Sequence, residues 1–184
     1  MNVVYAGSAG ASREFIRWSL PEIAIAGRSN SGKSSLLNRL AGHRGLARVS
    51  GTPGRTQRLH FFAVEPMRLA LVDLPGYGFA RAARSARERW GALIEEYLET
   101  RKNLRALLLL VDLRRDLGED EKQLAEFVRG RGLGFVPVAT KVDKLGRAER
   151  ERRLRAFGSG WIPFSALTGE GREEVLEALM RFSQ

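Results

Sequence analysis

Residues 27–34 read Gly-Arg-Ser-Asn-Ser-Gly-Lys-Ser, and this spacing of two glycines, a lysine and a serine can hold a polyphosphate. A polyphosphate carries several negative charges, and backbone N–H groups at the start of a helix bind them without covalent chemistry. Gly27 and Gly32 permit the tight turn. Lys33 can reach the terminal phosphates, and Ser34 offers a hydroxyl to Mg2+. The pattern predicts a nucleotide site whose loop consists of Gly27, Arg28, Ser29, Asn30, Ser31, Gly32, Lys33 and Ser34.

A second group, Asp73-Leu74-Pro75-Gly76, ends a run of apolar residues. A carboxylate there can reach Mg2+ through water, and a glycine can approach the terminal phosphate closely. D-x-x-G is a common turn in isolation, but here it follows the loop and its helix at the distance of a hairpin. We therefore expect Asp73, Leu74, Pro75 and Gly76 to contact the nucleotide.

A third group indicates which base is bound. Thr140-Lys141-Val142-Asp143 has the form [NT]-K-x-D, in which the carboxylate accepts two hydrogen bonds from guanine while the lysine stem lies along the base. Adenine lacks those donors, so discrimination of the order of 10⁴ is attainable. In isolation the tetrapeptide also suits a charged helix N-terminus. Ser165-Ala166-Leu167 follows the last expected strand, where a backbone N–H can meet the guanine carbonyl, and Phe164, Ser165 and Ala166 are expected to contact the nucleotide.

The elements that must position these groups follow from alternating hydrophobic blocks. Leu59–Val64 and Leu69–Val72 are too close for a helical crossover and predict an antiparallel hairpin, whereas the remaining strands predict parallel crossovers. The fold class expected is an α/β, doubly wound, mostly parallel six-stranded sheet with one antiparallel edge strand. Residues 1–20 are expected to be an N-terminal extension that packs partly through Phe15, Ile16 and Trp18, and residues 21–184 to be the domain. The other expected strands are Ile23–Ala26, Leu107–Val111, Phe135–Ala139 and Trp161–Phe164, and the expected helices are 33–41, 82–101, 119–130, 145–157 and 170–182.

Composition narrows the class of protein. The chain has 184 residues, no cysteine and 43% hydrophobic residues, which suits one globular domain and excludes disulfides and thiolate metal sites. There is no apolar run long enough for a membrane span and no signal-like N-terminus, so a cytoplasmic protein without a membrane partner is expected. The net charge of +10 favours a polyanionic partner such as nucleic acid, although an arginine-rich genome would produce the same balance.

Together, Gly27–Ser34, Thr56, Asp73–Gly76, Thr140–Asp143 and Ser165–Leu167 stand in the order typical of a translation-factor-class GTPase. With Thr52-Pro53-Gly54-Arg55-Thr56-Gln57 and Asp73-Leu74-Pro75-Gly76-Tyr77-Gly78, the chain resembles the EngB (YihA/YsxC) family of small bacterial GTPases over nearly its whole length. The resemblance implies a Ras-like P-loop GTPase domain that binds GTP and GDP with Mg2+. It also implies a role in assembling the large ribosomal subunit and in normal cell division and septation.

The resemblance also assigns roles to residues. Ser34, Thr56 and Asp73 are the implied metal ligands, and Lys33, Thr56 and Gly76 the implied catalytic residues. Segment 43–58 is glycine-rich and suits a switch loop that contacts the nucleotide only in the GTP state. The residues expected to make that contact are Gly54, Arg55, Thr56, Gln57 and Arg58.

Tyr77 stands where regulatory GTPases carry a glutamine that orients the attacking water. A tyrosine has no amide to do this, so slow intrinsic hydrolysis completed by another group is expected. The candidates are K+ beside Asn30, ribosomal RNA, and Arg55 in cis.

Residues 42–60 and 76–90 are the two expected switches, and arginines concentrate in both of them. This favours contact with ribosomal RNA or large-subunit assembly intermediates gated by the nucleotide. Two alternatives are a nucleotide-gated RNA-binding module with negligible turnover and an ATP-dependent kinase or transporter subunit. Thr140–Asp143 argues against the second of these. A monomer is the default oligomeric state.

Overall fold

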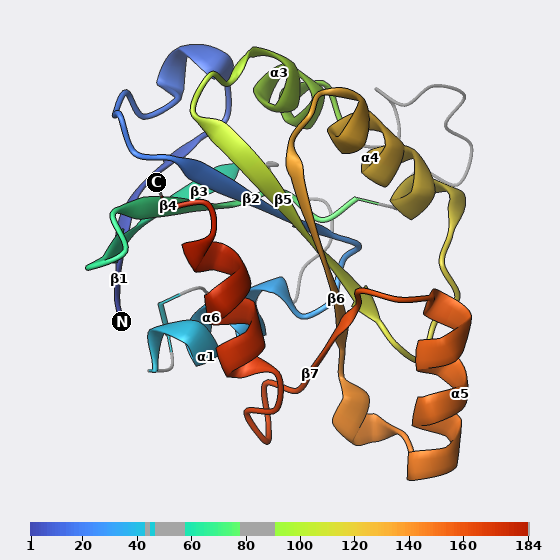
Figure 1. Cartoon of the computed structure of the whole chain (residues 1–184). Coiled ribbons are helices and arrows are strands. Elements are labelled where there is room, and N and C mark those ends of the chain that lie inside the picture. The colour runs from blue at the N-terminus through green and yellow to red at the C-terminus, as the bar shows by residue number, and fades with distance from the viewer. Residues whose placement is uncertain (43–44, 47–57, 78–90, 184) are drawn as a thin grey trace.

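The computed structural model describes residues 1–42, 45–46, 58–77 and 91–183 and shows one twisted sheet between two layers of helices (Figure 1). Seven strands lie in the order β1-β3-β4-β2-β5-β6-β7. They are β1 (Asn2–Ala9), β2 (Glu22–Gly27), β3 (Leu59–Glu65), β4 (Leu69–Asp73), β5 (Leu104–Asp112), β6 (Gly134–Thr140) and β7 (Ile162–Phe164). The helices are α1 (Lys33–Ala41), α3 (Ala92–Thr100), α4 (Glu119–Gly130), α5 (Arg147–Phe157) and α6 (Arg172–Met180), with short 3-10 turns η1 (Ser12–Glu14) and η2 (Val142–Lys144).

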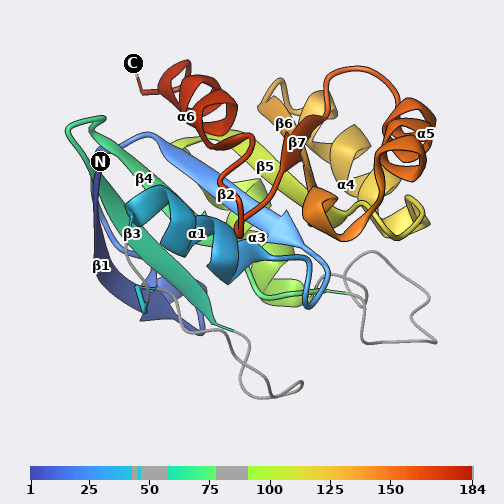
Figure 2. The ribbon, with the colours of Figure 1, turned by 90° about the horizontal axis from the view of Figure 1, so that it is seen from below.

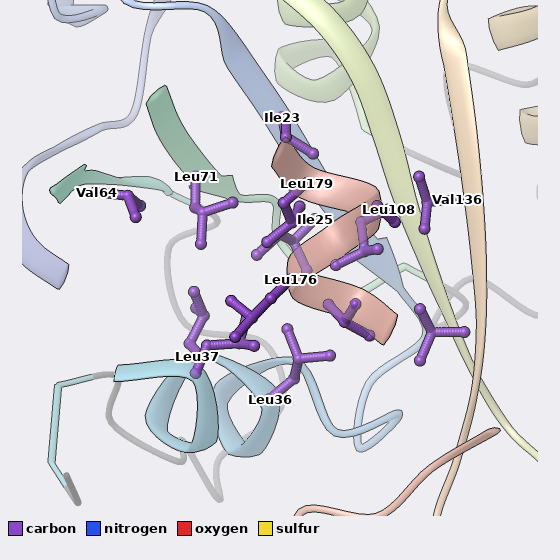
Figure 3. Close-up of a cluster of buried hydrophobic side chains, with 14 of the residues drawn as sticks. Ile23, Ile25, Leu36, Leu37, Val64, Leu71, Leu108, Val136, Leu176 and Leu179 are labelled. Carbon is purple, nitrogen blue, oxygen red and sulfur yellow. The ribbon is translucent and has the colours of Figure 1, made fainter. Parts of the chain in front are cut away.

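The two faces of the sheet carry separate cores because successive side chains of a strand point to opposite sides. Ile23 and Ile25 of β2 face α1 and α6, and Figure 3 shows Leu36, Leu37, Leu176 and Leu179 converging on them. Ala24 and Ala26, the alternate residues of the same strand, face the layer that contains α3 and α4. Figure 2 shows the two helical layers from a second direction. The doubly wound architecture is thus confirmed.

The number of strands in the sheet and the identity of its antiparallel edge strand differ from the prediction. The hairpin of β3 and β4 is antiparallel, as predicted, but β3 is not an edge strand because β1 pairs with it from Asn2 opposite Glu65 to Ala9 opposite Leu59. The sheet therefore has seven strands rather than six, and part of segment 1–20 belongs to it. Only Val3 and Ala9 of β1 are fully buried, so this strand lacks the apolar alternation by which sequence analysis finds strands.

The rest of segment 1–20 packs through Phe15, Ile16 and Trp18, as expected. A fully buried carboxylate, Glu22, holds it in place: Tyr97 of α3 donates its hydroxyl hydrogen to Glu22 over 2.8 Å, and the Trp18 indole and the Arg101 guanidinium donate as well. Three donors satisfy the buried charge at the start of β2, which is the end of the strand remote from residues 27–34.

The predicted helices 33–41 and 119–130 match α1 and α4, and 145–157 and 170–182 contain α5 and α6. The part of helix 82–101 within the described residues is α3, whose buried residues are Ile94, Tyr97 and Leu98. None of the helices in the described part of the chain has the length and apolar content that crossing a bilayer requires.

Candidate functional site

The predicted phosphate loop connects β2 to α1 at the carboxyl end of the parallel strands, where ligands bind in open α/β sheets. Gly32 is the residue before α1 and has φ of 104°, a left-handed conformation that a side chain would strain. The loop thus leaves the first N–H groups of α1 without intrahelical partners, as anion binding requires.

Lys33 and Asp73 bring opposite charges together beneath this loop. The Lys33 ammonium donates to the carbonyl oxygen of Gly27 over 3.3 Å, and burial lowers the pKa of Lys33. Asp73 ends β4, and its burial raises the pKa of the carboxyl to about 6, although the charge of Lys33 acts in the opposite direction. Each charged group therefore lies where an ionic ligand would relieve the cost of its burial.

The donor set around Asp73 fits Mg2+. Its Oδ1 atom is buried without a hydrogen-bond partner among the described residues. Ser34 lies in the first turn of α1, beside Lys33, and supplies a hydroxyl oxygen. Carboxylate and hydroxyl oxygens are the hard ligands that this ion prefers. Thr56, the third ligand expected, lies outside the described residues, as do Gly54, Arg55 and Gln57.

The D-x-x-G turn packs directly against the phosphate loop. The Leu74 N–H donates to the carbonyl oxygen of Ile25 over 3.0 Å, which continues the pairing of β4 with β2. A Cβ atom on Gly76 would lie 2.5 Å from Ser29 Oγ and 3.1 Å from the Ser29 backbone nitrogen. Only glycine therefore fits at position 76 in this conformation.

Tyr77 turns away from the loop. Its side chain is 4% exposed and packs in the core between the sheet, α3 and α4. Burial, followed by the nearby charge of Glu121, raises the pKa of its phenol. A ring enclosed in the core cannot take over the water-orienting part played by a glutamine, which agrees with the chemistry expected from its residue type.

The predicted base-reading motif, Thr140–Asp143, donates two hydrogen bonds to the phosphate loop. The Thr140 hydroxyl donates to the carbonyl oxygen of Ser31, and the Lys141 ammonium donates to that of Asn30, each over 2.6 Å. Lys141 has a φ of 61°, which turns the chain sharply after β6. The first two residues of the motif thus join the guanine and phosphate halves of the predicted site.

Asp143 has a defined orientation. The Ser165 hydroxyl donates to Asp143 Oδ1 over 2.7 Å, and this hydrogen bond holds the pKa of the carboxyl below its usual value. Ser165 Oγ in turn accepts the backbone N–H of Thr168 over 3.2 Å. The carboxylate is ionised at neutral pH, and its second oxygen, Oδ2, lies 3.5 Å from the ammonium of the exposed Lys144. Val142 and Phe164 are buried beneath this pair, and Ala166 is half-buried beside it.

The sequence predicts that Arg58 and Asn30 contact the nucleotide or a cation beside it. The Arg58 guanidinium donates to Ser8 and Glu14, so among the described residues it contacts the edge of the sheet and not the phosphate loop. Asn30 is exposed with a φ of 64°, and its part in K+ binding stays a prediction.

Sequence analysis missed Asp112, which ends β5 and is 3% exposed. Its carboxylate lies 3.1 Å from the Lys141 ammonium and accepts two hydrogen bonds from the Arg114 guanidinium. Burial works to raise the pKa of Asp112, but the hydrogen bonds from Arg114 and Lys141 prevail and lower it to about 2. Asp112 fixes the lysine that supports the loop. Its place at the carboxyl end of a buried parallel strand is the signal that could have revealed it.

Comparison with known proteins places these features in a family. The sequence pattern described as 50S ribosome-binding GTPase matches residues 22–141. The probable GTP-binding protein EngB of Pelotomaculum thermopropionicum is 42% identical over 98% of this chain and 95% of its own length. The protein of the same name from Solibacter usitatus is 47% identical over 94% of this chain and 91% of its own length.

Solved structures support the same fold. A crystal structure of a probable GTP-binding protein EngB superposes with a TM-score of 0.65 at 23% identity and covers 88% of this chain and 98% of that one. Era in complex with MgGDPNP and nucleotides 1506–1542 of 16S ribosomal RNA superposes with a TM-score of 0.62 at 19% identity and covers 90% of this chain and 57% of Era. At these identities the likeness establishes the fold alone.

The Asp112→Asn variant is expected to bind GDP about tenfold more weakly, because a neutral amide no longer holds the Lys141 ammonium against the phosphate loop. Titration calorimetry with GDP measures this. Asp116→Asn is the matched control, since the Asp116 side chain is 97% exposed and pairs with Arg153. Equal affinities in the two variants would contradict the role of Asp112.

The pH dependence of stability tests independently whether folding lowers the pKa of Asp112. The pKa of Asp112 falls from 3.8 to about 2 on folding, so its contribution to stability is complete above about pH 4 and is lost as the pH falls towards 2. Between these values the wild type should lose more unfolding free energy than Asp112→Asn. The unfolding free energy is measured by urea denaturation at each pH. If it changes equally with pH in the two proteins, folding does not lower the pKa of Asp112 and the prediction is wrong.

Proposed function

Since this chain belongs to the EngB family of 50S ribosome-binding GTPases, and is therefore a GTPase, we propose that it acts as a nucleotide-controlled switch in large ribosomal subunit assembly. The observation that carries the proposal is the meeting of Lys33, Asp73 and the Thr140–Asp143 motif at one end of the sheet, around a loop built for phosphates. The proposal extends to a cytoplasmic monomer needed for normal cell division and septation.

Each group of residues has a distinct task in this proposal. Asp143 accepts the two guanine N–H groups, and the Lys141 stem lies along the base. The loop N–H groups and the Lys33 ammonium hold the phosphates, and the Gly76 N–H meets the terminal one. Ser34, Thr56 and Asp73 would hold Mg2+, which when bound neutralises charge on the phosphate oxygens. Thr56 and Gly76 thus sense whether the terminal phosphate is present.

Hydrolysis by this site is proposed to be slow without a partner. Tyr77 is enclosed in the core, so no amide at this position orients the attacking water. The three candidates for the missing group remain K+ beside Asn30, ribosomal RNA, and Arg55. A group that arrives with the assembling particle would couple hydrolysis to a step of assembly.

The proposed partner is ribosomal RNA or a large-subunit assembly intermediate. Support comes from the net charge of +10 and from the arginines that the sequence places in both expected switches. A nucleotide that rearranges those segments changes the array of cations facing RNA phosphates. Guanine nucleotide state and RNA affinity would then be thermodynamically linked.

The Asp143→Asn variant tests base recognition. An amide in place of the carboxylate cannot accept both guanine hydrogen bonds, so we expect GTP to bind about a hundredfold more weakly while xanthosine triphosphate gains affinity. Competition of the two nucleotides against fluorescent GDP measures the change. Glu177→Gln, an exposed acid on α6, removes the same charge and should leave the preference unaltered. Retained GTP preference in Asp143→Asn would refute the assignment.

Co-sedimentation with ribosomal subunits and assembly intermediates tests the proposed partner. With a non-hydrolysable GTP analogue we expect binding that falls roughly tenfold for each doubling of salt, as about four phosphate contacts would produce. With GDP the same particles should bind much less protein. Binding that ignores both the nucleotide and the salt concentration would count against a switched RNA contact.

A further inference from the structure

The backbone around Gly76 is joined to the phosphate loop by a short stretch of sheet-like pairing. Arg28 and Tyr77 form an isolated parallel bridge, and the Ser29 N–H donates to the carbonyl oxygen of Tyr77 over 3.4 Å. Gly76 lies against Ser29 with no space for a Cβ atom. The position of Gly76 relative to the loop therefore depends on where Tyr77 is held.

Tyr77 is held by its side chain from the other direction. Its hydroxyl donates to Glu121 Oε1 of α4 over 3.2 Å, and both residues are almost fully buried. The ring packs among the buried side chains of α3 and α4, including Ile94, Leu124 and Val128. A tyrosine so enclosed has one polar atom, and Glu121 is the group that satisfies it.

Glu121 is itself fixed at both oxygens. Its Oε2 atom accepts the Gly118 N–H over 2.8 Å, which satisfies the backbone donor of the residue before α4. Arg28 of the phosphate loop lies beside it: a Cβ atom on Gly118 would be 2.7 Å from Glu121 Oε2 and 3.3 Å from Arg28 Nη1. Arg28 and Glu121 also line one pocket with Asn30 and Asp112. The carboxylate thus stands between α4, the D-x-x-G turn and the loop.

We propose that Glu121 is a positioning residue for the GTPase reaction, acting through the Tyr77 hydroxyl to keep Gly76 against the phosphate loop. Glu121 touches neither nucleotide nor metal in this assignment. It determines where the Gly76 N–H points, and so how well the site binds the terminal phosphate that distinguishes GTP from GDP. The inference rests on the proposed contact between Gly76 and that phosphate.

The chain contains a second buried tyrosine that serves as a matched comparison. Tyr97 of α3 donates its hydroxyl to Glu22 over 2.8 Å in the same core cluster. Its partner begins β2, at the end of the sheet remote from the loop. Tyr77→Phe and Tyr97→Phe both delete one buried hydroxyl that bonds to a buried glutamate. A purely structural role for Tyr77 predicts the same consequences for both variants.

The test compares GDP, the non-hydrolysable analogue GMPPNP and GTP turnover in the two variants. For Tyr77→Phe we expect unchanged GDP affinity, GMPPNP affinity lowered about fivefold and kcat lowered to a similar extent, as loss of one buried hydrogen bond would produce. For Tyr97→Phe we expect a similar fall in melting temperature but wild-type values for all three nucleotide measurements. Glu121→Met, whose side chain offers no strong hydrogen-bonding group to the Tyr77 hydroxyl, should follow Tyr77→Phe.

The double variant Tyr77→Phe/Glu121→Met shows whether the two residues act as one unit. The proposal is supported if the double variant binds GMPPNP no more weakly than the weaker-binding of the two single variants, because both changes break the same Tyr77–Glu121 hydrogen bond. Additive losses, or Tyr77→Phe and Tyr97→Phe variants with the same nucleotide profile, overturn the role of Glu121. Failure of the wild-type protein to bind GMPPNP would instead overturn the proposed function, so the two failures are distinguishable.

Discussion

The site depends on two hydrogen bonds that come from the end of β6, which β5 separates from β2 in the sheet. Thr140 and Lys141 donate to the carbonyl oxygens of Ser31 and Asn30, which lie in a loop with little regular structure of its own. A loop that must turn its N–H groups towards a ligand turns its carbonyls elsewhere, and those carbonyls need donors. The donors come from the motif that reads the base, so phosphate binding and base recognition cannot be built separately.

The same end of the sheet carries charges that the rest of the fold leaves incompletely compensated. Lys33 and Asp73 are both half-buried, and Asp73 Oδ1 lacks a hydrogen-bond partner among the described residues. At the opposite end, the buried carboxylate of Glu22 has three side chains as donors. The two ends of the sheet differ because their tasks differ. The end with Glu22 anchors the N-terminal segment, and the end with Lys33 and Asp73 is completed by its ligand.

Tyr77 links the two parts of this argument. By residue type it cannot orient water, and by position it belongs to the core, where Glu121 satisfies its hydroxyl. In the proposed function Gly76 contacts the terminal phosphate, and a neighbouring residue anchored in the core would tie that contact to the packing of α3 and α4. Under this proposal one side chain would serve both structural rigidity and nucleotide sensing.

By itself the sequence predicted the phosphate loop, the D-x-x-G turn, the guanine motif and the places of all strands but one along the chain, because each has a local signature in spacing or periodicity. The tertiary structure alone decided that Asn2–Ala9 is an edge strand beside β3, since it buries only Val3 and Ala9 and so shows no pattern. It alone revealed Asp112 and Glu121. Asp112 pairs with Lys141, 29 residues away in the chain, and Glu121 pairs with Tyr77, 44 residues away. A lone carboxylate has no motif, and its role arises only from the charge or hydroxyl that folding brings beside it.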